Sequence, residues 1–568
     1  MTDHDLVLRG GTVIDGTGAD GRTADVAVDD GIVTEVGRID GRGRQEIDAD
    51  GALVTPGFVD IHTHYDGQAV WDERLAPSSW HGVTTVVMSN CGVGFAPVRA
   101  HDRQRLVELM EGVEDIPGTA IHEGLHWGWE SFAEYLDALD GRPHDIDFAA
   151  QLPHAALRLF VMGDRCAADQ EATADDIAEM ARLAAEAIEA GALGFTTSRT
   201  RNHRASTGEH TPTLRAARAE LVGIAEAIGS TGTGVLQVVS DFLDLDDEVG
   251  TVRAMAEVSG RPLSISLLQN PFFPTQWRSL LEALEAGRAD GLALTGQVAP
   301  RPVGILLGLQ ATLHPFLGNP AFMEVAELPF DEKLAALRDP ERRRRVLDEA
   351  AARAATLPFE SMFELGDPPD YEPQPEHSVA AAAARLGIDA AEHAYDLMLG
   401  DDGRALLYVP FLNYADGNLD PQREMLAHPW TVPGLGDGGA HVGTICDGSF
   451  PTTLLTLWGR DRERGRFELP FLVQRHTSGT ARTVGLLDRG VLAPGYRADL
   501  NVIDLDGLRL RPPEIHHDLP AGGRRLLQRA EGYRHTIVAG VETYRDGQPT
   551  DERALPGRLV RGARPAPV

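Results

Sequence analysis

The chain has 568 residues and a formal net charge of −34, with acidic residues along its whole length. This length exceeds the usual size of one domain, so more than one hydrophobic core is expected. So acidic a surface is a poor partner for nucleic acid and for anionic membranes, and the sequence has no apolar run of the roughly 20 residues that would span a bilayer.

The N-terminal residues lack the charged and then apolar pattern of a secretion signal, so a cytoplasmic location is expected. Cysteine usage agrees, because Cys91, Cys166 and Cys446 are too few and too scattered for a disulfide framework.

Residues 1–56 show short alternating strand patterns separated by turn signals. The signals are Gly10-Gly11, Asp30-Gly31 and Asp50-Gly51. The same pattern of short strands and turns occurs again near the C-terminus, in RADLNVIDLD and RHTIVAGVETYRDGQ. Neither stretch is large enough to be stable alone, so the two ends are expected to form one small β-sandwich from residues 1–56 and 485–550.

The segment VTPGFVDIHTHYDGQ, residues 54–68, places two histidines at the end of an apolar run. His62 and His64 are two residues apart, so they point to the same side if the run is a strand. Two imidazole nitrogens can then bind one metal ion at roughly 2.0–2.1 Å each. The pattern predicts a metal site at the C-terminal end of a short buried strand.

Between the two ends, residues 57–484 alternate strand and helix patterns, which predicts an α/β protein with a TIM-like (β/α)8 barrel. The clearest unit has Thr173 as the helix N-cap, acidic residues in the first turn, Gly191 as the stop and a strand after it. Active sites of such barrels lie at the C-terminal ends of the strands, where the chemistry is therefore expected.

Residues 301–430 interrupt this alternation with an Arg/Glu/Ala-rich helical pattern around residues 342–355, the Pro-rich LGDPPDYEPQPEHS and further helical patterns. An inserted helical subdomain or lid would produce this sequence, and so would helices packed on the outside of the barrel. The sequence alone leaves both readings open.

Several motifs resemble one known family. PGFVDIHTHYD resembles the first-strand signature of the amidohydrolase superfamily, and WHGVTTVVMSNCGVGFAPVR, residues 80–99, resembles its N-acyl-D-amino-acid deacylase (D-aminoacylase) branch. Four more segments follow in that family's order: GALGFTTS, GDGGAH, RHTSGTARTVGLLDRGVLAPGYRADLNVID and IVAGVETYRDGQPTDERALPGRLVR. The resemblance covers both ends of the chain well and the middle in patches.

The resemblance implies a metal-dependent hydrolase of non-peptide C–N bonds, with His62, His64, Cys91 and Asp437 as metal ligands. It also implies that Asp437 is the general acid/base, which takes a proton from a water activated by the metal and gives it to the leaving nitrogen. The residues themselves agree, because Cys91 ends the second expected strand and Asp437 the eighth, on either side of the strand that carries the histidines.

The chain also departs from the family pattern. The family has two further histidine ligands after strands five and six, where this chain has Val238 or Val239 and Leu267, with Gln269 in place of a lysine. Its single lysine, Lys333, lies in a polar helical segment, which excludes the subtype bridged by a carboxylated lysine. One zinc ion is therefore expected rather than two.

The loop after the fourth expected strand is rich in basic residues. Arg199 and Arg204 could each bind a substrate carboxylate through a bidentate fork. His203, in the same loop, and His441 are further candidates for substrate binding. A solvated basic loop is the alternative reading. The expected partner is a small amide substrate that carries a carboxylate, and a homo-oligomer is compatible with the sequence.

Two alternative functions stay open. The same barrel could open cyclic amides or act as a deaminase. An alternative of another class is a metal-poor binding protein or assembly subunit, which the presence of all four candidate ligand types disfavours.

Overall fold

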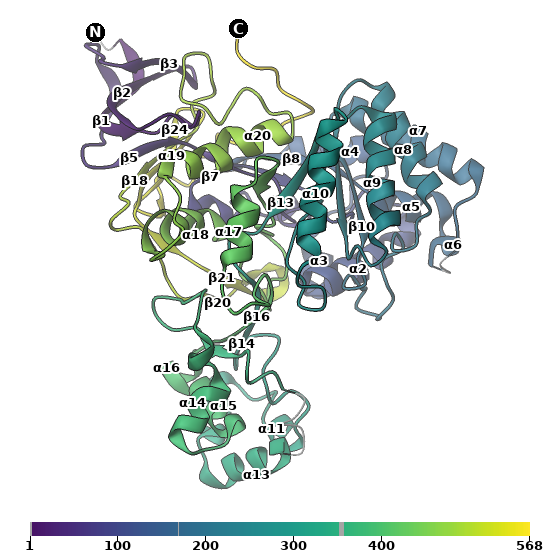
Figure 1. The fold of residues 1–568 in the computed structure, drawn as a ribbon, viewed down its shortest axis with the longest axis vertical. Coiled ribbons are helices and arrows are strands. Elements are labelled where there is room, and N and C mark those ends of the chain that lie inside the picture. The colour runs from purple at the N-terminus through teal and green to yellow at the C-terminus, as the bar shows by residue number, and fades with distance from the viewer. Residues whose placement is uncertain (1–2, 168–169, 352–356) are drawn as a thin grey trace.

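The computed structural model describes residues 3–167, 170–351 and 357–568. Figure 1 shows three parts: a sheet that holds the N-terminus, a central α/β body, and a lobe that projects from that body. Within the described residues, no helix combines the length and the apolar character needed to cross a membrane.

Both ends of the chain contribute to one nine-stranded sheet. The two halves meet where β5 pairs antiparallel with β18, with Val54 opposite Val502. The N-terminal strands are β1 (His4–Val13), β2 (Arg22–Asp29), β3 (Ile32–Gly37), β4 (Gly43–Asp48) and β5 (Leu53–Pro56). The C-terminal strands are β18 (Leu500–Ile503), β23 (Tyr533–Val538), β24 (Val541–Arg545) and β25 (Gln548–Pro549). Buried side chains from both halves share one core, so neither half is complete without the other.

The central body contains two parallel sheets. The smaller one has β6 (Phe58–Asp60), β7 (Val83–Met88) and β8 (Asp147–Ala150). The larger one has β9 (Leu152–Pro153), β10 (Gly194–Arg199), β11 (Val235–Ser240), β12 (Leu263–Ser266), β13 (Leu294–Val298) and β17 (Thr431–Pro433).

The expected closed eight-stranded barrel is thus not seen as one continuous sheet among the described residues. At one junction β8 and β9 follow each other along the chain and are separated by Gln151, whose backbone N donates to Met88 O at the end of the β7–β8 ladder. At the other junction the loop after β17 meets the residues after β6 through a single parallel bridge, Thr63 with Gly438. The sheets therefore meet at their edges through loops.

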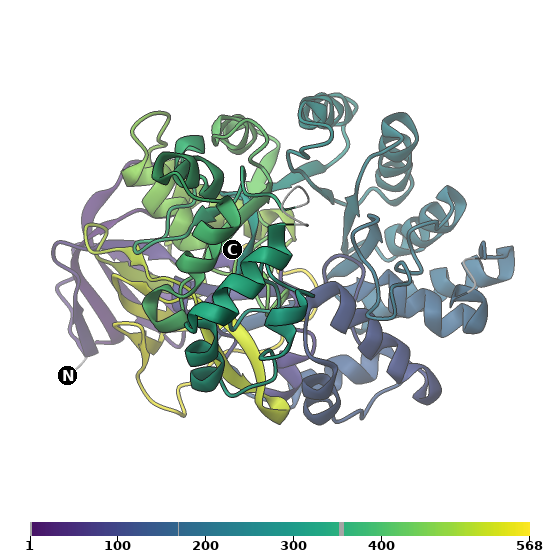
Figure 2. The same ribbon diagram turned by 90° about the horizontal axis from the view of Figure 1, so that it is seen from below.

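Helices cover the outer face of the larger sheet. They include α7 (Ala174–Ala190), α8 (Arg218–Ser230), α9 (Leu245–Ser259) and α10 (Gln276–Ala289). In Figure 2 these helices form an arc around the strands. The predicted helix limits are confirmed for α7, because Thr173 caps its N-terminus in a reciprocal box with Asp176 and Gly191 ends it with φ 114°.

The projecting lobe lies within the segment 301–430. Its stem is a small antiparallel sheet, β14 (Val303–Leu307), β16 (Leu407–Leu412) and β15 (Phe363–Glu364). Its helices include α11 (Pro320–Met323), α12 (Phe330–Leu337), α13 (Pro340–Ala351), α14 (Val379–Leu386) and α15 (Ala390–Met398). The lobe has its own hydrophobic core. Residues 352–355 of the helix expected around residues 342–355 lie outside the described residues.

Candidate metal centre and active site

His62 and His64 lie just beyond the end of β6, and each side chain is only 1% exposed. The backbone N of His62 donates to Asp60 Oδ1 at 3.1 Å, and that of His64 donates to Gly438 O at 2.8 Å. These bonds fix the chain where the strand ends. The two ring centroids are 5.7 Å apart, so the two histidines face a common space.

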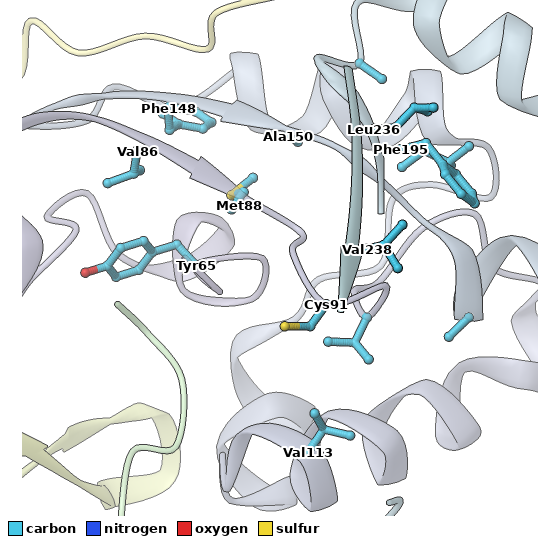
Figure 3. Packing of buried hydrophobic residues seen from close by; sticks show 14 of the residues in the cluster. Tyr65, Val86, Met88, Cys91, Val113, Phe148, Ala150, Phe195, Leu236 and Val238 are labelled. Carbon is cyan, nitrogen blue, oxygen red and sulfur yellow. The ribbon is translucent and has the colours of Figure 1, made fainter. Parts of the chain in front are cut away.

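Cys91 brings a sulfur to this space from beyond the end of β7. Its Sγ is 3.2 Å from His62 Nε2, and its backbone N donates to Gln237 Oε1. Figure 3 shows the side chain past the end of the strand, near Val113 and Val238. Its φ of 55° is in the left-handed region, a conformation that costs a non-glycine residue about 1 kcal/mol or more. The surrounding structure must hold the loop in place.

Asp437 follows β17 and also has a positive φ, 46°. Its backbone N donates to His62 O at 2.9 Å, which docks this loop on the histidine segment. Its Oδ1 lies 3.4 Å from His62 Nε2 and 3.5 Å from His64 Nε2. The side chain therefore faces both imidazoles.

Three of these side chains, His62, His64 and Cys91, form a group that could hold a zinc-type ion, and Asp437 lies beside the two histidines of this group. The donor atoms of His62, His64 and Cys91 all lie within 4.8 Å of one another. Bonds of 2.0–2.3 Å in a tetrahedral site place neighbouring donors about 3.3–3.8 Å apart, close to the 3.2, 3.4 and 3.5 Å observed. Asp437 Oδ1 is also buried without a hydrogen-bond partner, a deficit that a bound cation would correct.

The charge states differ between the two histidines. Burial lowers the pKa of His62 to about 4, against the pull of Asp437. Burial also acts to lower the pKa of His64, but Glu114 and Asp437 together raise it well above its usual value. The Asp437 carboxyl, despite its burial, keeps a pKa well below the usual range because of both histidines. Asp437 is therefore ionised at neutral pH.

Two side chains behind the ligands were not found by sequence reasoning. Gln297 Oε1 accepts from His62 Nδ1 at 2.7 Å, and its Nε2 donates to Ser264 Oγ at 2.9 Å. Glu114 Oε1 lies 3.2 Å from His64 Nδ1. The position of Gln297 at the end of β13 was a usable signal, whereas Glu114, at the end of helix α2 (Arg103–Glu114), carries no motif.

The strand ends that lack histidine lie on the same cavity. Val239 of β11 lines it, and so do Ser266 and Leu268 at the end of β12. Val238 and Leu267, by contrast, are packed in the hydrophobic core. Ser266 and Leu268, rather than Leu267, thus face the cavity at the end of β12.

The cavity has a volume of about 230 Å³ and opens over His62, Cys91 and Asp437. Part of its wall comes from the lobe's stem. The apolar lining is Val113, Val239, Phe242, Leu268, Leu280, Val303, Phe411, Leu412, Leu435 and Ile445. The polar lining beyond the metal-centre residues is Thr200, Asn202, His203, Ser240, Asp241, Ser266, Asn270, Gln276 and His441.

The four predicted substrate-binding residues are placed differently. His203 and His441 line the cavity, and His203 Nδ1 is 2.8 Å from Ser198 Oγ. Arg199 forms a bidentate ion pair with Glu248 and also donates to Ala216 O. Arg204 is exposed and donates to Gly208 O within its own loop. The structure thus brings the two histidines to the cavity and holds the two arginines elsewhere.

The mixed α/β fold places histidine, cysteine and aspartate side chains beyond its strand ends, an arrangement typical of metal-dependent hydrolases. The model of the amidohydrolase family matches residues 45–544. The chain belongs to the amidohydrolase family and is a hydrolase of carbon–nitrogen bonds other than peptide bonds. The family resemblance seen in the sequence is thus confirmed.

The related proteins place the chain as a divergent member near the D-aminoacylases. It is 28% identical over 520 residues to a D-aminoacylase of Alcaligenes xylosoxydans xylosoxydans, which covers 88% of each chain. It is 28% identical to an N-acyl-D-glutamate deacylase of the same organism, over 98% of this chain and 96% of the relative. An N-acyl-D-glutamate deacylase structure from Bordetella bronchiseptica, complexed with zinc and a phosphonate inhibitor, matches with TM-score 0.64 and 25% identity over 98% of this chain and 99% of that one.

Proposed function

We propose that this protein hydrolyses the amide bond of small N-acyl amino acids at a single zinc ion held by His62, His64, Cys91 and Asp437. The observation that carries the proposal is the grouping of the His62, His64 and Cys91 donor atoms within 4.8 Å of one another, with Asp437 Oδ1 at 3.4 and 3.5 Å from the two imidazoles. We further propose that the two parallel sheets act together as one barrel-like scaffold that holds these strand ends in place.

A zinc ion held by these residues would supply an electrophile that polarises an amide carbonyl, and it would lower the pKa of water towards about 7. Asp437 supplies the proton transfer. It borders the cavity and is ionised at neutral pH, so it can accept a proton from the attacking water and deliver it to the leaving nitrogen.

His203 and His441 orient the substrate in this proposal. Burial lowers the pKa of His203 to about 3, so its ring is neutral at pH 7 and can donate one hydrogen bond to the carbonyl oxygen. The apolar walls suit an uncharged acyl group or side chain. A carboxylate-binding role for Arg204 stays a prediction. Arg199 instead forms an ion pair with Glu248, which connects β10 to α9.

Metal content tests the proposal first. Protein purified without chelators is expected to carry about one zinc per chain, which His62→Ala and Cys91→Ala each remove. Wild-type protein is then assayed on paired N-acetyl-D- and N-acetyl-L-amino acids, with amine release and ammonia release followed separately. A protein that contains zinc and hydrolyses none of these amides would refute the proposed substrate class.

A further inference from the structure

The carboxylate of Glu114 is buried directly behind the candidate metal centre. Glu114 is the last residue of α2, and its side chain is 1% exposed. The next residue, Asp115, adopts a φ of 53°, which ends the helix and turns the chain away. Val442 N donates to Glu114 O at 3.2 Å, so the loop that follows Asp437 rests on this helix end.

The two carboxylate oxygens face two different histidines. Oε1 is 3.2 Å from His64 Nδ1, and Oε2 is 3.8 Å from His441 Nε2. Glu114 Oε2 and His64 Nδ1 are both buried without a hydrogen-bond partner, so the 3.2 Å contact between the two side chains is an ion-pair contact rather than a hydrogen bond. A charged group buried in this way is costly unless it serves the groups around it.

We propose that Glu114 is a positioning residue for the metal centre: it keeps the proton of His64 on Nδ1, so that Nε2 presents its lone pair to the metal, and it ties His64 to the loop of His441. This inference rests on the proposed metal site. His64 Nε2 already faces Asp437 Oδ1, so the electrostatic attraction of a carboxylate 3.2 Å from Nδ1 favours the ligating orientation of the ring. A carboxylate behind a ligating imidazole also makes it a stronger donor.

The two histidine ligands are therefore supported unequally. His62 is backed by the neutral amide of Gln297, whereas His64 is backed by the charged carboxylate of Glu114. The negative charge behind His64 adds to the attraction for a divalent cation. Removing it is expected to weaken zinc binding, although Glu114 itself does not line the substrate cavity.

The test compares Glu114→Gln with Glu108→Gln, which makes the same change of charge six residues earlier on α2, where Glu108 accepts from Gln104. Zinc dissociation constants are measured by competition with a chelator, and melting temperatures are measured on the metal-free proteins. Glu114→Gln is expected to weaken zinc binding about 10–100-fold with no fall in the metal-free melting temperature. Glu108→Gln is expected to match wild type in both measurements.

A purely structural role for Glu114 would lower the metal-free melting temperature and leave zinc binding unchanged, which would overturn the inference. If Glu114→Gln does not fold, Glu114→Asp is measured instead. Its charge is kept but drawn back by one methylene, so weaker zinc binding than wild type supports the inference and equal binding overturns it. Wild-type protein that binds no zinc would overturn both this inference and the proposed function, whereas equal zinc binding in all variants overturns this inference alone.

Discussion

Asp437 and His62 are joined through both backbone and side chain. The backbone N of Asp437 donates to His62 O at 2.9 Å, and Asp437 Oδ1 lies 3.4 Å from His62 Nε2. The loop after β17 therefore cannot shift without moving the segment that carries the histidines. This connection holds Asp437 Oδ1 within 3.5 Å of both imidazoles.

Asp437→Asn is expected to lower kcat for amide hydrolysis by about 10²–10⁴-fold, because an amide of the same size cannot take up the proton of the attacking water. Initial rates at saturating substrate and zinc measure the effect. Asp246→Asn, an exposed change on α9, is the control and should keep wild-type rates. Full activity in Asp437→Asn would exclude the acid/base role.

Cys91→Ser is expected to weaken zinc binding by at least about 10–100-fold, the range seen when only outer partners of a ligand are lost. The reason is that a serine hydroxyl does not ionise as a ligating thiol does. Burial raises the pKa of the Cys91 thiol to about 11, so zinc binding must also displace its proton. Calorimetry in buffers of different ionisation enthalpy should count fewer released protons for Cys91→Ser than for wild type at pH 7.

Cys166→Ser is the matched control for this experiment. Cys166 is also buried, but its sulfur lies near Arg158 and away from the cluster of histidines. Zinc binding in this variant should equal that of wild type. If the two serine variants lose zinc equally, Cys91 is not a ligand.

His203→Ala is expected to lower kcat/KM by about 10²–10³-fold, the usual cost of removing one hydrogen-bond donor to a developing oxyanion. Zinc content should stay at the wild-type level. His210→Ala changes an exposed histidine of the same loop and should leave both measurements unchanged. A loss of zinc in His203→Ala would instead make this residue a ligand.

Glu542 provides a pH-dependent test of the sheet that both termini build. Its carboxylate binds His535, Arg545 and Gln45 at 2.5–2.8 Å. Burial alone would raise its pKa, but His535 and Arg545 lower it to about 2. Because the folded pKa lies below the unfolded one, this stabilisation is complete above about pH 4.5 and is lost as the pH falls towards about 2.

Glu542→Gln should therefore lower the free energy of unfolding by about 2 kcal/mol at pH 7, with a smaller difference from wild type at each step below about pH 4.5. Melting curves between pH 7 and pH 3 give the comparison. Glu552→Gln, at an exposed position, is the control. A difference that grows on acidification would contradict the assigned ion pairs.

Much of the candidate site could be predicted from local sequence. The two-residue spacing of His62 and His64 fixes a shared side at the end of a strand, whatever packs around it. Thr173 and Gly191 likewise set the limits of α7 through bonds within a few residues. Such features depend on backbone geometry over one turn or one strand, which the neighbouring residues determine.

The remaining features depended on contacts between distant segments. Gln297 reaches His62 across 235 residues of chain, and Glu114 reaches His64 from the end of a helix that carries no motif. The sequence predicted that Arg199 binds substrate, but in the structure its guanidinium forms an ion pair with Glu248. The sequence by itself determined which side chains could bind a metal. The tertiary structure alone decided which residues contact those side chains from behind, because only the fold brings residues that are distant in sequence within a few ångströms of one another.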